Sequence, residues 1–136
     1  MKTKDKREIS VEEAYLRLAT TAAAIGFGVY VAQKMGRRRH DRVAHARMAS
    51  YWLIRRGLGL SYEAIGASFS KDHGSIMHGC TKVEEILEHD QRNTYNNNWC
   101  DNIKKSRKYF IKLHKARAEA DINRKLKEVE DVIQAA

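Results

Sequence analysis

The stretch LSYEAIGASFSKDHGSIMHGCTKVEEIL, residues 60–87, decides the fold of this chain. Its apolar residues recur at three- and four-residue spacing in two runs, which predicts two helices. Ser61 and Asp72 stand before these runs, where a side-chain oxygen can accept from a free backbone N–H as an N-cap. Ser70 and Lys71 are expected to make the turn between them. Two short helices joined by a tight turn are typical of a helix-turn-helix.

The two predicted helices each have a buried side and an outward side. The residues expected in the core are Leu60, Ile65, Phe69, Ile76, Cys80, Val83 and Leu87. The polar residues that fall largely outside this stripe are His73, Gly74, Ser75, His78 and Lys82. In a helix-turn-helix, the leading residues of the second helix reach base edges in the major groove of DNA. The alternative is an ordinary pair of amphipathic helices that binds nothing.

The histidines of the second helix also raise the question of a metal site. His73 and His78 are five residues apart, which places them on different sides of a helix, and no acidic or cysteine partner stands at ligand spacing. We therefore expect no metal. The Asp-His-Gly-Ser run is a poor catalytic triad, because a helix start holds these residues as neighbours without aiming one at another. We expect no enzyme activity and no cofactor.

The charge of the chain points to a polyanionic partner. Lys and Arg number 26 against 17 Asp and Glu, which gives a formal charge of +9 and a pI near 9.7. Such a field favours nucleic acid or an acidic membrane surface. Much of it lies just upstream of the motif, in Lys34, Arg37, Arg38, Arg39, Arg42 and Arg47. We predict that GRRRHDR is a loop entering a helix, suited to the minor groove beside the recognition helix; a solvated basic loop is the alternative.

From Arg37 to Leu87 the chain resembles the C-terminal DNA-binding domain of DnaA, the bacterial replication initiator. The segments RRRHDRVAHAR, LSYEAIGASF and KDHGSIMHGCTKVEEIL carry the likeness. The last resembles the family signature of Asp-His, two small hydroxylic residues, two aliphatics and His-Ala. AAAIGFGVYVAQKMGRRR also fits, as the connecting helix and short second helix. The likeness covers about 21–89, with a looser fit near 100–114. It implies an all-α, Trp-repressor-like helix-turn-helix domain that binds short A·T-rich boxes in double-stranded DNA.

The resemblance also implies roles for individual residues. Base reading is carried over to Arg39 in the minor groove and to His73, Gly74, Ser75 and His78 in the major groove. Arg47 matches a basic residue near the DNA backbone, and Asp72 matches the acid that opens the signature helix as its cap. Beside the resemblance, we also expect backbone contacts from Arg37, Arg38, Arg42, Ser61, Lys71 and Lys82. Gly74 replaces the usual Ser or Thr, Met48 a common glutamine, and His45-Ala46 a usual Arg-Pro. These departures place the preference for the usual box in question.

DnaA also carries an ATP-binding motor, and its phosphate loop GxxxxGK[ST] is not found in this sequence. We therefore expect a stand-alone DNA-reading domain that acts in replication control or transcriptional regulation without ATP hydrolysis. The alternative is a protein-interaction module that binds DnaA or other replication proteins, with weakened DNA reading. The expected location is cytoplasmic and nucleoid-associated.

The remaining sequence predicts one all-helical domain with an added helix. We expect a disordered segment over 1–9, the DNA-binding domain over 10–115 and a helical extension over 116–136. In the extension, Ile122, Leu126, Val129 and Ile133 form an apolar stripe suited to a homodimer or a partner helix, or to packing on the domain itself. The uncharged run 18–32 is short for a membrane span and is better explained as a buried helix. Cys80 and Cys100 do not make a disulfide framework.

Overall fold

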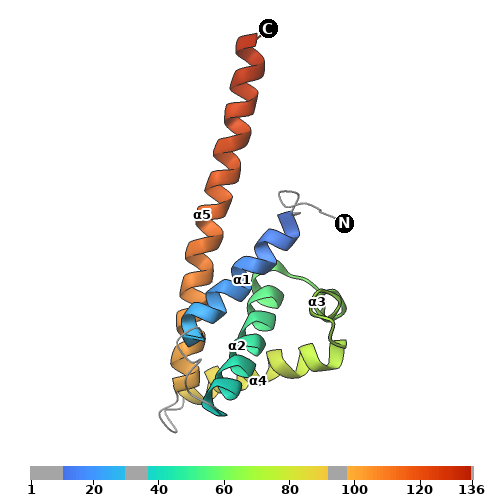
Figure 1. Ribbon diagram of the computed structural model, residues 1–136, viewed down its shortest axis with the longest axis vertical. Helices are drawn as coiled ribbons and strands as arrows, with labels where there is room; N and C mark the ends of the chain where they lie inside the picture. The colour runs from blue at the N-terminus through green and yellow to red at the C-terminus, as the bar shows by residue number, and fades with distance from the viewer. Residues whose placement is uncertain (1–10, 30–36, 92–97, 136) are drawn as a thin grey trace.

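The computed structural model describes residues 11–29, 37–91 and 98–135, and within these residues the chain is helical (Figure 1). This confirms the all-α prediction. The predicted disordered segment 1–9 lies outside the described residues. The elements are α1 (Val11–Phe27), α2 (Arg37–Leu53), the π-helical turn η2 (Ile54–Leu58), α3 (Tyr62–Phe69), α4 (His73–Gln91) and α5 (Asn98–Ala135).

The helix-turn-helix consists of α3, a short turn and α4. Both predicted N-caps are confirmed: the Ala64 N–H donates to Ser61 Oγ over 3.1 Å, and the Ser75 N–H donates to Asp72 Oδ1 over 3.1 Å. Ser70 ends α3 in the left-handed region with φ of 57°. The Lys71 N–H then donates to the Gly66 carbonyl over 2.9 Å. A Cβ at Gly66 would collide with the Lys71 carbonyl oxygen, so glycine permits the tight turn.

The core forms where α1, α2, α4 and the start of α5 meet. Ile65, Ile76, Cys80 and Val83 are buried as predicted, while Leu60, Phe69 and Leu87 are partly buried against the same core. Aromatic residues from the other helices complete it, with Trp52, Phe27 and Phe110 buried. The packed α3 and α4 therefore rest on α2, and the outward face of α4 is left to solvent.

The first helix packs closely along α5, and this is the most extensive helix pair of the fold. Ala19, Ala22 and Ala23 are fully buried, as expected of a small-residue helix. The C-terminus of α1 is capped by Gly28 with φ of 62°, whose following residue, Val29, donates its N–H to the Ala24 carbonyl over 3.0 Å. No helix among the described residues has the length and apolarity that a membrane crossing requires.

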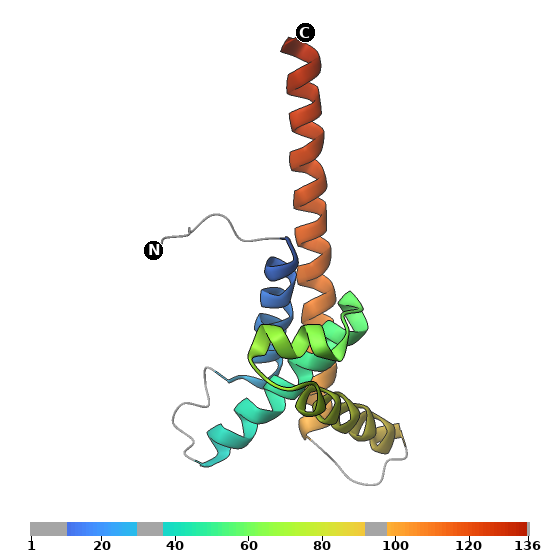
Figure 2. The ribbon, with the colours of Figure 1, turned by 90° about the vertical axis from the view of Figure 1, so that its right-hand side faces the viewer.

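The last helix is much longer than its packing surface. α5 runs for 38 residues without a break, across positions 115 and 116. Its first half packs on the domain through Cys100, Ile103, Ser106 and Phe110, which are buried. Its second half projects away from the rest of the molecule, and the C-terminus lies at the far tip (Figure 1, Figure 2). Of the two alternatives for the apolar stripe, packing on the domain itself is wrong, because residues 122–135 are exposed.

The prediction of a basic loop is wrong for the stretch from Arg37 onward. Arg37, Arg38 and Arg39 form the first turn of α2, and only residues 30–36 before them lie outside the description. Arginine is a good helix former, and after Gly36 no residue interrupts the helix. A run of like charges is common in loops, but here the helix propensity of arginine decides the local structure.

One histidine packs against a tryptophan beneath the motif. The ring of His45 in α2 stacks on Trp99 at the start of α5, with centroids 3.6 Å apart and planes inclined by 7°. Burial lowers the pKa of His45 from its ordinary value of 6.5; Asp41 opposes this change and Lys82 adds to it. The folded protein therefore favours the neutral ring, and α2 is held to α5 through it.

This gives a prediction for the pH dependence of stability. Because the folded-state pKa of His45 lies below 6.5, its contribution is complete above that pH and is lost as the pH falls below it, where the unfolded chain takes up the proton. The wild type should lose more free energy of unfolding between about pH 7.5 and about pH 5.5 than His45→Phe, which keeps an aromatic ring but cannot titrate. Urea unfolding at both pH values measures this, and equal losses would contradict it.

Candidate nucleic-acid interface

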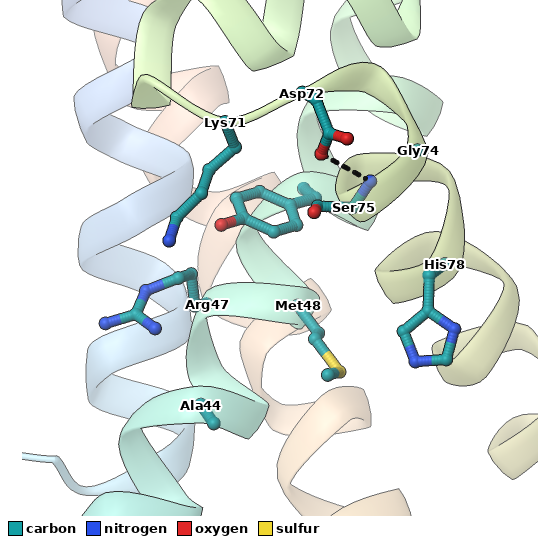
Figure 3. Close-up of a pocket in the computed structure, with 9 residues that line it drawn as sticks. Ala44, Arg47, Met48, Lys71, Asp72, Gly74, Ser75 and His78 are labelled. Atoms are coloured by element: carbon teal, nitrogen blue, oxygen red, sulfur yellow. Dashed lines mark hydrogen bonds between the residues drawn. The ribbon is translucent and has the colours of Figure 1, made fainter.

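A groove of about 480 Å³ separates α2 from the beginning of α4 (Figure 3). Its lining comes from three places: the exposed face of α2, the turn before α4, and the first two turns of α4. The lining residues are Ala44, Arg47, Met48, Tyr51, Lys71, Asp72, Gly74, Ser75 and His78. The structure thus brings together six of the residues predicted to contact DNA or cap the recognition helix, from segments separated by more than twenty positions.

The charge of the groove is positive along one side. Lys71 from the turn extends toward Arg47 of α2, and His78 lies on the opposite side, with Ser75 between them (Figure 3). Arg47, Lys71, Ser75 and His78 are all exposed. The carboxylate in the lining belongs to Asp72. Hydrogen bonds from Ser75, the side chain first and then the backbone N–H, hold the pKa of Asp72 below its usual range.

Because Asp72 is paired with Ser75, the cations Arg47 and Lys71 and the polar groups of the rim are available to a ligand. Asp72 is an acceptor already engaged at the N-terminus of α4, where a negative charge suits the helix dipole. Arg47 offers a planar fork of donors, which matches phosphate geometry, and Lys71 offers a mobile point charge. Ser75 and His78 can each donate or accept. The arrangement can therefore bind an anionic backbone along one side and read hydrogen-bonding groups along the other.

The floor of the groove is tightly packed. A Cβ built on Gly79 would lie 3.1 Å from Tyr51 Cδ2 and 3.2 Å from Met48 Cγ, so glycine lets α4 approach α2 closely. Tyr51 is buried, and its ring meets Phe69 edge-on with centroids 5.1 Å apart. Burial raises the pKa of Tyr51 above its usual value. The floor is thus fixed by packing, while the rim residues are free to adjust.

The other predicted site residues lie around this groove. His73 and Lys82 are exposed on α4. Arg42 donates from Nη1 to the Phe27 carbonyl over 3.0 Å and so helps to cap α1. Ser61 uses its hydroxyl to cap α3. Arg37, Arg38 and Arg39 form the first turn of α2, and the structure does not describe their side chains.

Sequence reasoning missed part of the groove. Ala44 and Tyr51 line it but were not predicted, and Met48 was noted only as a departure from the family pattern. The signal was available: positions 44, 47, 48 and 51 follow the spacing of one helix face, and Arg47 was already assigned to the DNA side. The groove therefore depends on the supporting helix α2 as much as on the recognition helix α4.

The capped α3–turn–α4 unit and the basic groove beside its second helix define a helix-turn-helix domain of the DNA-binding class. Residues 20–83 match the family model described as "Bacterial dnaA protein helix-turn-helix". This segment therefore belongs to the bacterial DnaA helix-turn-helix family, which confirms the resemblance seen in the sequence.

Curated relatives agree with this assignment. The chromosomal replication initiator protein DnaA 2 of Chlamydia muridarum is 30% identical over 89 residues, covering 65% of this chain and 18% of the relative. DnaA of Thermomicrobium roseum is 33% identical over 82 residues, with 60% and 18% covered. DnaA 2 of Chlamydia pneumoniae is 30% identical over 97 residues, with 71% and 20% covered. The chain spans about a fifth of the length of these relatives. No solved structure matches it.

Proposed function

We propose that this chain binds double-stranded DNA in a sequence-specific manner at A·T-rich boxes of the DnaA type. α4 enters the major groove with His73, Gly74, Ser75 and His78 toward the bases. Arg39, at the start of α2, enters the adjacent minor groove. We further propose that this binding serves replication control or transcriptional regulation.

The single observation that carries the proposal is the groove itself. Arg47 and Lys71 are exposed at one rim and His78 at the other, with Ser75 between them, in a domain whose family reads DNA. Phosphate contacts position a protein on the duplex, while contacts to base edges provide specificity. The two rims supply the two kinds of contact side by side.

The start of α2 supports the same orientation. Arg37, Arg38 and Arg39 occupy the first turn of that helix, and no acidic residue stands there. Cations at a helix N-terminus are unfavourable next to the positive end of the dipole, and an anion at this position relieves that repulsion. A DNA phosphate is such an anion.

The first test is a selection of bound sequences from a random duplex pool, followed by binding measurements at moderate salt. We expect enrichment of a short A·T-rich motif and a clear preference over nonspecific competitor. If the selection enriches no motif and all duplexes bind with the same affinity, sequence-specific reading is contradicted. Nonspecific DNA binding would still be measured in the same assay.

Ser75→Ala provides the residue-level test. Losing a base-edge contact should cost about 1–3 kcal/mol on the selected site and little on nonspecific duplex. Arg39→Ala should behave in the same way at the A·T-rich part of the site. An equal loss on every sequence would show that these residues contact only phosphates. Urea unfolding of each variant controls for changes in stability.

Gly74→Ser tests the departure from the family pattern. A Cβ at Gly74 would meet only Asp72 Oδ2, at 3.7 Å, so a serine fits without displacing its neighbours. The new hydroxyl stands on the exposed rim beside Ser75 and can hydrogen-bond to a base or a phosphate. We expect the affinity for the usual DnaA-type box to rise several-fold, about 1 kcal/mol. Unchanged affinity on both that box and the selected site would contradict a role for position 74.

A further inference from the structure

The projecting end of α5 carries most of the exposed apolar side chains of the protein. Among the described residues, seven large hydrophobic residues are exposed, and five of them lie in this short segment: Ile122, Leu126, Val129, Val132 and Ile133. Their exposed fractions run from 55% to 69%. A monomeric protein rarely leaves such a contiguous apolar strip in water.

The described part of the domain also gives the helix in this segment no support. Residues 122–135 are exposed throughout, and just before them Asp121 accepts a hydrogen bond from Tyr15 of α1. An isolated helix of about this length is marginal in water, and most helices are stabilised by packing an apolar face. The segment therefore needs a partner surface along its strip.

The spacing of the strip defines its register. Ile122, Leu126, Val129 and Ile133 follow intervals of four, three and four, which are the d, a, d and a positions of about two heptads. Val132 occupies a g position and widens the strip. Leucine at a with β-branched residues at d favours three or four parallel strands over two.

The charges beside the strip select the partner. Position g is occupied by Lys125 and the next e position by Glu130, and in a parallel in-register assembly these two face each other between neighbouring copies. In an antiparallel pair, with Ile122 opposite Ile133, Lys125 would face Val132 and Glu130 would face Asn123. The strip is thus complementary to a parallel copy of itself.

We propose that residues 122–135 pack against the same segment of further copies of this chain, parallel and in register, and so form a small closed oligomer. The proposal does not depend on DNA binding. Where it operates together with the DNA-binding domain, it brings several recognition helices to the same end of one assembly, and linked binding modules gain affinity on properly spaced paired sites.

Sedimentation of the full chain over a range of concentrations is the first measurement. We expect a concentration-dependent mass above that of the monomer, and Leu126→Glu should be monomeric at the same concentrations with an unchanged helix-turn-helix by circular dichroism and urea unfolding. A wild type that remains monomeric at on the order of 100 µM would overturn the proposal.

A charge exchange tests the register. Lys125→Glu places like charges opposite each other and should weaken association about tenfold, while the double variant Lys125→Glu/Glu130→Lys restores it. Lys127→Glu is the matched control, because it changes the charge equally on the outer side of the same turn. Equal weakening by Lys127→Glu, or failure of the double variant to recover, would contradict the parallel register.

A cysteine at Ile122 tests the direction. In a parallel in-register assembly, Ile122→Cys side chains of neighbouring copies lie at one level and form an intermolecular disulfide under mild oxidation. In the antiparallel arrangement they lie about 16 Å apart along the axis and cannot. Cys80 and Cys100 are buried and serve as the background in the wild type. An oligomer without this crosslink would refute the parallel arrangement.

Discussion

Gly26→Ala is expected to destabilise the protein by about 3 kcal/mol. Gly26 lies where α1 crosses α5. A Cβ there would lie 2.7 Å from the Ser106 backbone nitrogen and 2.8 Å from its Cα, and it would also collide with Ser106 Oγ. Ser106 is fully buried and its hydroxyl donates to the Asn102 carbonyl, so neither helix can yield without breaking packed contacts. Urea unfolding measures the loss.

Two further variants test whether the loss in Gly26→Ala comes from a collision with the backbone of residue 106. Gly74→Ala makes the same substitution in a helix with open space around it, and it should raise the stability by about 0.5–1 kcal/mol. Adding Ser106→Ala to Gly26→Ala should recover little, because the backbone atoms of residue 106 remain in place. Full recovery would show that the collision involves only the serine side chain.

Reversing both cations of the groove should abolish DNA binding at moderate salt. Arg47→Glu/Lys71→Glu replaces two exposed positive groups with negative ones on the rim that we assign to the phosphates. We expect at least a hundredfold loss of affinity, about 3 kcal/mol, on selected and nonspecific duplexes alike. The corresponding alanine variants should each lower the slope of log affinity against log salt by about 0.9.

Lys112→Glu/Lys115→Glu is the matched control for the charge reversal. Both lysines are exposed on α5, and the change in net charge is identical. A uniform effect of net charge would weaken binding equally in the two double variants, whereas a phosphate contact in the groove predicts a much larger loss for Arg47 and Lys71. Equal losses would refute the assignment of this rim.

The helix-turn-helix could be predicted from the sequence because its signals are local. Ser61 and Asp72 are N-cap residues that mark the beginnings of α3 and α4. The apolar spacing from Ile65 to Val83 determines which side of these helices is buried. The family match followed from the same stretch. Such signals depend on neighbouring residues and need no knowledge of the rest of the chain.

What the sequence could not provide was how distant helices meet. The floor of the groove depends on Gly79 lying against Met48 and Tyr51 across two helices, and no spacing within either helix reveals that contact. Arg42 was assigned to DNA on charge, while its Nη1 donates to the Phe27 carbonyl. The length of α5 beyond the domain was likewise ambiguous, since an apolar stripe can pack inward or outward.

The close approach at Gly79 has a mechanical consequence. Because no side chain at position 79 separates them, α4 and its supporting helix α2 are in close contact and must move together as one rigid unit. The helix backbones of such a unit cannot reshape themselves to suit different ligands, although the side chains at the rim of the groove can adjust. If the chain binds DNA as proposed, the duplex would have to adapt to this rigid unit, so the ease with which a given stretch of bases deforms should contribute to which sites are chosen.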